Sequence, residues 1–175
     1  MYKEIGNNEE NRRYIDICEL NEKNYIISGG NKGVTVFNYP ELTEYFCFVE
    51  NNDSNYHNYA KVIKINEIYN LIDVGSFNSI KIWDFMNKTL IANISSNIST
   101  NLDGFTTINN KYLIIGGRDG SIKEFDLENR LLITNFEQHH QKSFVLGVKP
   151  IKDKNGKTFL ISYGSDKNIF LWDLE

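Results

Sequence analysis

The sequence predicts an all-β fold made of four consecutive antiparallel sheets. The main observation is a twelve-residue phrase that occurs four times without gaps, at residues 28–39, 74–85, 116–127 and 163–174. The aromatic residues that anchor neighbouring copies lie roughly 40–50 residues apart, a period typical of repeat architectures. The second observation is that two further strand-like runs separate successive copies, so each period contains four strands.

Each copy of the phrase, together with the apolar run that leads into it, predicts a strand, a turn and a second strand. The first strand is short and apolar, as in Tyr112–Ile115, and the second is rich in β-branched and aromatic residues, as in Ile80–Trp83. Gly, Asn, Asp and Ser fill the turn between them, because they supply positive φ angles or local side-chain hydrogen bonds. In the last period, Asn155-Gly156 favours a two-residue turn ahead of the phrase.

The strands outside the phrase follow in the same order in every period. The strands that precede it are predicted at 14–20, 59–65, 104–108 and 144–151, and those that follow it at 44–49, 89–94 and 131–136. The fourth period ends before its last strand.

Composition excludes several classes of function. The chain has 175 residues, a net charge of −4 and no strongly basic patch, which argues against nucleic acid as a partner. Its apolar runs are too short to cross a membrane, and its first residues lack the apolar segment of a secretory signal. Cys18 and Cys47 fall in predicted strands and suit a reducing compartment, so we expect a cytoplasmic protein.

Two tryptophan–aspartate pairs, Trp83-Asp84 and Trp172-Asp173, end the second strands of the second and fourth copies. On these residues the chain resembles the WD-repeat β-propeller family, over roughly residues 13–175. The resemblance implies one propeller unit with blades near 13–50, 57–95, 101–137 and 139–175. Residues 1–6 would be a candidate closing strand for the last blade.

The fourth repeat is the best formed of the four. By resemblance, His139, Ser162, Asp166 and Trp172 form the structural hydrogen-bond tetrad of the family. The other blades depart from this pattern: the second offers His57, Asp73, Phe77 and Trp83, the third Asp119 and Phe125, and the first Asn31 and Phe37.

The candidate catalytic groups are few. His139 and His140 lack a third metal ligand at a sensible spacing, and neither cysteine lies in a turn or a nucleophile signature. The glycine-rich run at 116–120 is followed by no helix pattern, so it predicts a β-turn rather than a phosphate-binding loop. We therefore expect no catalytic residue, no metal and no cofactor.

Surface recognition remains as the expected function. The resemblance implies that partners dock on the narrow face, where the residue before the tetrad acid is exposed; the equivalents here are Gly30, Ser76, Arg118 and Ser165. Arg118 suits polar recognition best, because its planar guanidinium fits carboxylate or phosphate. The sequence thus predicts a non-catalytic scaffold that binds other proteins or peptides. The alternative is a regulatory propeller segment of a larger multidomain protein such as a kinase.

Four blades leave the closure of the propeller open. The chain could close as a four-bladed ring, two copies could close an eight-bladed ring as a homodimer, or the chain could be part of a larger propeller.

Overall fold

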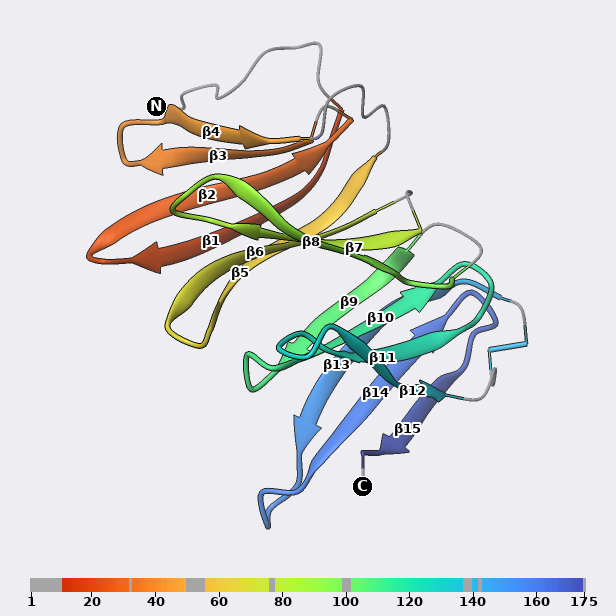
Figure 1. Ribbon diagram of the computed structural model, residues 1–175. Helices are drawn as coiled ribbons and strands as arrows, with labels where there is room; N and C mark the ends of the chain where they lie inside the picture. Colours follow the sequence, from red (N-terminus) through yellow and green to blue (C-terminus); the bar gives the residue numbers. More distant parts are fainter. Residues whose placement is uncertain are drawn as a thin grey trace. The chain divides into compact units, whose positions relative to one another are not determined.

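A computed structural model describes residues 11–31, 33–49, 56–75, 78–98, 102–136, 140–141 and 143–174 (Figure 1). Its regular elements are fifteen strands: β1 (Arg12–Leu20), β2 (Lys23–Gly30), β3 (Gly33–Tyr39), β4 (Thr43–Phe48), β5 (His57–Ile65), β6 (Ile68–Gly75), β7 (Ser79–Asp84), β8 (Thr89–Ser95), β9 (Leu102–Ile108), β10 (Tyr112–Gly117), β11 (Ile122–Asp126), β12 (Leu131–Phe136), β13 (Val145–Lys152), β14 (Thr158–Gly164) and β15 (Ile169–Asp173).

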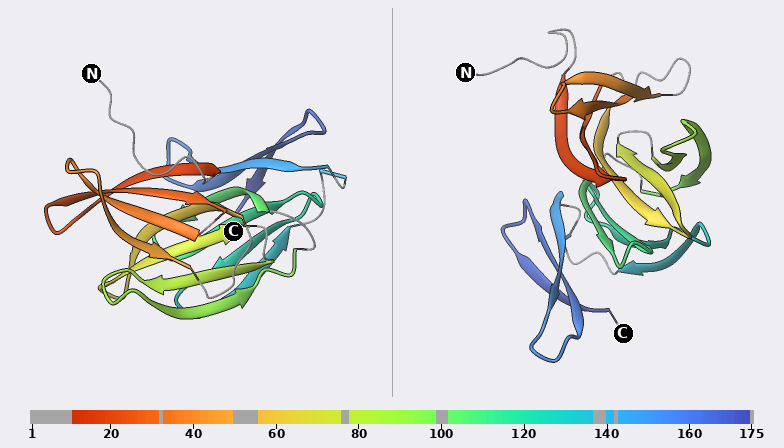
Figure 2. Two further views of the ribbon diagram at one scale, coloured as in Figure 1. Left: turned by 90° about the horizontal axis from the view of Figure 1, so that it is seen from above. Right: turned by 90° about the vertical axis from the view of Figure 1, so that its left-hand side faces the viewer.

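The strands form four separate sheets in which spatial order follows chain order. Three sheets have four strands each, β1–β4, β5–β8 and β9–β12, and the last has three, β13–β15. Figure 2 shows the twist of the strands and the last sheet, in blue, ending at β15. The predicted all-β fold with four sheets is confirmed, and the last sheet lacks its fourth strand within the described residues.

Asparagine supports the hairpins that open the sheets. In each of the first three sheets, the connection from the first strand to the second contains two consecutive residues with positive φ, at Asn21-Glu22, Asn66-Glu67 and Asn109-Asn110, and in the third sheet it also includes Lys111. This pattern belongs to the tight hairpin turn whose twist matches that of the strands, and asparagine tolerates it better than most residues.

The hairpin of the last sheet is different, and the predicted two-residue turn at Asn155-Gly156 is wrong. A five-residue loop, 153–157, joins β13 to β14. The Asp153 carboxylate accepts hydrogen bonds from the backbone N–H groups of Asn155 (2.8 Å) and Lys157 (2.9 Å). This side-chain acceptor stabilises a longer loop in which only Gly156 has a positive φ.

The aspartate after the anchoring aromatic residue caps the turn between the third and fourth strands. Asp84 Oδ1 accepts from the backbone N–H of Asn87 (2.8 Å), and Asp126 Oδ1 accepts from that of Asn129 (2.9 Å). The backbone bond from Asn87 lowers the pKa of the Asp84 carboxyl. Burial by itself raises the pKa of Asp126, but the bonds from Asn129 outweigh it and lower the value.

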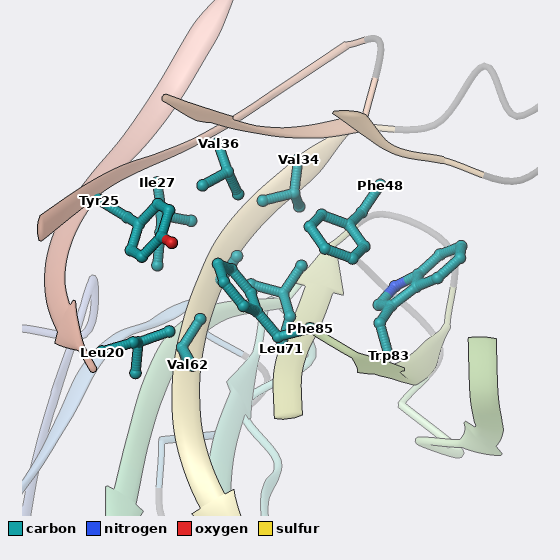
Figure 3. Close-up of a cluster of buried hydrophobic side chains, with 11 residues drawn as sticks. Leu20, Tyr25, Ile27, Val34, Val36, Phe48, Val62, Leu71, Trp83 and Phe85 are labelled. Carbon is teal, nitrogen blue, oxygen red and sulfur yellow. The ribbon is translucent and has the colours of Figure 1, made fainter. Parts of the chain in front are cut away.

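The chain divides into two compact units, Met1–Ile63 with Tyr69–Asn93, and Lys64–Ile68 with Ile94–Glu175. In the first unit, the faces of sheets β1–β4 and β5–β8 share one hydrophobic core. Figure 3 shows Tyr25, Ile27 and Val36 opposite Leu71 and Phe85. The Phe85 ring stacks on Tyr45 and Phe48 at centroid distances of 5.5 and 5.7 Å.

The second unit contains an equivalent core between sheets β9–β12 and β13–β15. Its buried members are Ile108, Ile114, Ile122, Phe136, Val145, Val148 and Leu160, with Trp172 packed against them. Each unit is therefore a pair of sheets that bury one face against each other, which is how neighbouring propeller blades pack.

Strand register corrects the alignment of the first copy. In the last three sheets, the cross-strand pairs Asp73 with Lys81, Ile115 with Lys123, and Ser162 with Phe170 have the same separation along the sequence. In the first sheet Ser28 pairs with Thr35, one residue closer. The first copy therefore has a turn that is one residue shorter, and Ser28 is the structural equivalent of Ser162.

Candidate functional site

A continuous hydrogen-bond network joins four side chains of the last sheet. Trp172 Nε1 donates to Ser162 Oγ (2.8 Å), and Ser162 Oγ lies 2.9 Å from His140 Nε2. His140 Nδ1 lies 3.0 and 3.1 Å from the two carboxylate oxygens of Asp166. With the proton of the His140 ring on Nδ1, Trp172, Ser162 and His140 each donate once along the network, and the Asp166 carboxylate accepts.

The histidine of this network is His140, not its predicted neighbour His139. His139 lies outside the described residues. His140 is fully buried and its ring packs edge-on against Phe170, with centroids 4.7 Å apart. Two adjacent histidines fit the spacing of the repeat almost equally well, so only the three-dimensional position of the ring distinguishes them.

The Asp166 carboxyl is held in its ionised form. Burial opposes this, but hydrogen bonds from the His140 ring and from Asn168 lower its pKa. The backbone N–H of Asn168 donates to Oδ1 (3.2 Å), and its side chain donates to Oδ2 (3.1 Å). The network thus fixes the β14–β15 turn to the interior of the sheet.

Gly164 explains why a glycine precedes this turn. A Cβ atom there would lie 2.7 Å from His140 Nδ1 and 2.9 Å from Asp166 Oδ1. The same arrangement occurs at Gly117, where a Cβ atom would meet the Ile98 side chain and Asp119 Oδ1. Ile98 therefore stands in the third sheet where His140 stands in the fourth.

The third sheet carries an apolar version of the network. Ile98, Ile115 and Phe125 occupy the positions of His140, Ser162 and Trp172, and all three are buried. Lys123 occupies the position of Phe170, and its ammonium donates to the carbonyls of Ser96 (3.2 Å) and Asn97. Burial lowers the pKa of this lysine.

The second sheet carries a version built from ionisable side chains. His57 Nδ1 lies 2.7 Å from Asp73 Oδ2, and both side chains are fully buried. Asp73 takes the place of the serine and pairs across the strands with Lys81, which is also buried. Trp83 Nε1 has no hydrogen-bond partner among the described residues, whereas Trp172 has one. Phe77, the fourth predicted member, lies outside the described residues.

Arg118 lies in the turn that precedes β11, where the sequence placed a recognition residue. Its Nε donates to Asp103 Oδ2 (2.6 Å), and its Nη2 lies 3.4 Å from Asp103 Oδ1. The guanidinium carbon lies 5.2 Å from the centre of the Phe144 ring. The side chain of Arg118 is 37% exposed and that of Asp103 18% exposed.

Phe144 connects Arg118 to Ser165. Ser165 Oγ accepts from the backbone N–H of Phe144 (2.9 Å), and the N–H of Ser165 donates to the carbonyl of Phe144 (2.9 Å). Phe144 itself is 43% exposed. We call Asp103, Arg118, Phe144 and Ser165 the Arg118 patch. Sequence reasoning missed Asp103 and Phe144, because neither lies inside the repeated phrase.

The other two predicted contact residues do not join this patch in the structure. Gly30 is buried and is the last residue of β2, paired with Gly33. This follows from the shorter turn of the first copy, which moves Gly30 out of the turn and into the strand. Ser76 lies outside the described residues.

The cysteines lie in strands, Cys18 in β1 and Cys47 in β4, as the sequence predicts. Burial, with a smaller contribution from Asp16, raises the pKa of the Cys18 thiol to about 12, which keeps it in the unreactive thiol form. Among the described residues, no group of three or more His, Cys, Asp or Glu is placed to hold a metal ion. The same residues include no helix long and apolar enough to cross a bilayer.

In sequence, the chain is similar to a segment of a larger protein. No protein-family model matches the chain. Over 68 residues it is 35% identical to the pre-mRNA-splicing factor PRP46 of Candida albicans, a segment that covers 39% of the chain and 16% of that protein.

Two solved structures resemble the fold closely. The computationally designed Ika4 protein matches over the full length of both chains with a TM-score of 0.74 and 15% identity. Raptor of Chaetomium thermophilum matches 97% of this chain and 16% of its own, with a TM-score of 0.74 and 13% identity. At these identities the likeness shows the fold alone. The chain has the fold of an incomplete β-propeller of about four blades, and its repeats fit the WD-like type.

Proposed function

We propose that this chain is a non-catalytic propeller module that binds other proteins or peptides through the Arg118 patch. The observation that supports the proposal is the exposed Phe144 ring beneath the Arg118 guanidinium, both fixed in place by their neighbours. Aromatic and arginine side chains contribute most of the binding energy at protein interfaces. A rigid scaffold that presents them from loops loses little entropy on binding.

The chemistry of the patch defines the partner that it suits. Asp103 already pairs with the arginine, so the patch is nearly neutral and offers a ring, a guanidinium plane and a carboxylate. This combination suits a peptide segment with an apolar or aromatic side chain next to a polar or basic one. It suits a phosphorylated partner less well, because Asp103 would repel the phosphate.

The chain offers a matched control. Lys157 Nζ lies 2.7 Å from Asp173 Oδ2 and 5.3 Å from the centre of the Phe159 ring. It repeats the cation, carboxylate and ring of the Arg118 patch at another place in the same unit. An effect of charge alone would appear equally at both places.

The experiment is a selection of displayed random peptides on the immobilised chain, followed by titration of the enriched peptides against variants. Phe144→Ala and Arg118→Glu should each weaken binding by about tenfold or more, which corresponds to the roughly 1.4 kcal/mol expected of an interface anchor. Lys157→Glu should leave the affinity unchanged. If every selected peptide binds Phe144→Ala and Arg118→Glu as tightly as the wild type, the Arg118 patch is not the binding site.

A second candidate is a regulatory propeller segment within a larger protein. It is favoured by the lengths of the similar proteins, since the chain spans only 16% of PRP46 and of Raptor. The Arg118 patch would then contact another domain of the same polypeptide, and the sequence flanking the gene segment would show that domain. Cytoplasmic localisation stays a prediction from the sequence.

A further inference from the structure

Sheet β1–β4 buries one face in the first unit and exposes the other. Burial alternates along β1, and on its exposed side Ile15 and Ile17 are each 67% accessible to solvent. A groove of about 490 Å³ runs over this side, lined by Arg13, Ile15, Ile26 and Phe37 among others. We call the set of Arg13, Ile15, Ile17, Ile26 and Phe37 the Ile15 face.

Sheet β13–β15 also exposes the face that does not join the core of its unit. Ile169 is 74% and Leu171 66% exposed, and Ile151 and Tyr163 are nearly half exposed. Cross-strand pairing places Leu171 beside Ile161, and Ile169 beside Tyr163. We call Ile151, Ile161, Tyr163, Ile169 and Leu171 the Leu171 face. Apolar surface gathered in this way on one sheet face is typical of a contact site.

The strand register shows what kind of surface the Ile15 face is. Ile15 pairs with Ser28, just as Val148 pairs with Ser162. Ile26 pairs with Phe37, just as Leu160 pairs with Trp172. Val148, Leu160 and Trp172 form the side of sheet β13–β15 that packs against the preceding sheet. The Ile15 face is therefore built to receive a preceding sheet.

The same comparison identifies the Leu171 face. Ile161 pairs with Leu171, just as Ile27 pairs with Val36. Ile27 and Val36 are fully buried, and they belong to the side of sheet β1–β4 that packs against the following sheet (Figure 3). The Leu171 face is therefore built to pack onto a following sheet, which is the role complementary to that of the Ile15 face.

We propose that a second copy of this chain covers both faces, with the Leu171 face of each copy packed on the Ile15 face of the other. Neither face has a partner sheet within its own unit, and a second copy supplies the complementary surface to each. In this pair each copy uses both of its faces on the same partner, so no face remains for a third copy and the assembly does not extend into a filament. This pairing is independent of peptide binding at the Arg118 patch.

Sedimentation equilibrium on the full chain tests the proposal. The wild type should have twice the 20.3 kDa mass of one chain. The double variants Ile15→Glu with Ile17→Glu, and Ile169→Glu with Leu171→Glu, should each be monomers. The control, Leu131→Glu with Ile133→Glu, alters residues of β12 that are 61% and 49% exposed and should remain a dimer. Circular dichroism and thermal melting establish that each variant is folded.

Mixing the two face variants distinguishes this pairing from the alternatives. Each variant alone has a damaged surface in both contacts. In a mixed pair, one contact joins the intact Leu171 face of the first variant to the intact Ile15 face of the second. An equimolar mixture should therefore form dimers again, although neither variant does so alone.

Four results would overturn the proposal. A monomeric wild type means that no second copy covers the faces, and assemblies larger than a dimer mean that the contacts do not close. Face variants that each remain dimeric alone mean that like faces pair with like, because each variant then keeps one intact contact. Face variants that stay monomeric on mixing mean that the Leu171 face does not pack on the Ile15 face.

Discussion

Replacing Ser162 by alanine tests the network of the last sheet most sharply. Ser162 is fully buried and its hydroxyl serves two partners, Trp172 Nε1 and His140 Nε2. Water can reach the partly buried indole, but His140 is fully buried and its ring nitrogen would lose its partner. A buried polar group left unsatisfied costs about 1–3 kcal/mol.

This cost converts into a measurable change in melting temperature. For a chain of this size, 1 kcal/mol lowers Tm by roughly 2–4 °C, so Ser162→Ala should melt about 5 °C lower than the wild type. Calorimetry or circular dichroism melts provide the measurement. Ser165→Ala is the matched control, because that hydroxyl is exposed and accepts only one backbone bond. It should change stability by about 0.5 kcal/mol or less.

The third sheet supplies a second control for the same reasoning. Its Ile98, Ile115 and Phe125 show that an apolar set fits these positions. The combined variant His140→Ile, Ser162→Ile and Trp172→Phe removes three polar members at once and leaves Asp166 with its hydrogen bonds from Asn168, so it should cost less than the sum of the three single changes. If Ser162→Ala melts like the wild type, the hydroxyl satisfies no buried group and the reasoning fails.

Two further predictions concern stability at low pH and the space available beside two glycines. The pKa values of Asp84, Asp126 and Asp166 are all lower in the folded chain than in the unfolded chain, where they are about 4. The stability that these three ionised carboxylates give the fold is therefore complete above about pH 4 and is lost as the pH falls through their folded pKa values. Tm should fall steeply below about pH 4, and a Tm unchanged down to pH 3 would contradict this account. Gly164→Ala should cost about 1–3 kcal/mol, because its Cβ would meet His140 and Asp166, whereas Gly156→Ala in open space should cost only the roughly 1 kcal/mol of its positive φ. Equal melting of the two glycine variants would show that space at Gly164 is not limiting.

The repeated phrase was enough to predict the fold. Its alternation of apolar strands and Gly-Asn-Asp turns specifies hairpins locally, and the period specifies four sheets. It also placed Ser162, Asp166 and Trp172, because these lie at fixed distances within one hairpin. Arg118 and Ser165 were placed near the surface for the same reason.

The parts of the site that the phrase did not predict depend on residues outside it. His140 precedes β13 and so lies outside the β14–β15 hairpin, where the spacing of the phrase does not distinguish it from His139 in the sequence. Asp103, in β9, and Phe144, just before β13, contact Arg118 from elsewhere in the chain, so their roles follow only from packing. Gly30 was misplaced because a turn shorter by one residue moved it into β2, and no feature within the phrase marks that difference.

A crystal structure of the wild-type chain decides which sheet faces pack against each other. We expect Ile15 and Ile17 of one copy to be buried against Ile161 and Leu171 of a second copy, with the same contact repeated by the symmetry of the pair. Crystals in which the Ile15 face and the Leu171 face of one chain cover each other, or in which both stay exposed to solvent, would contradict it.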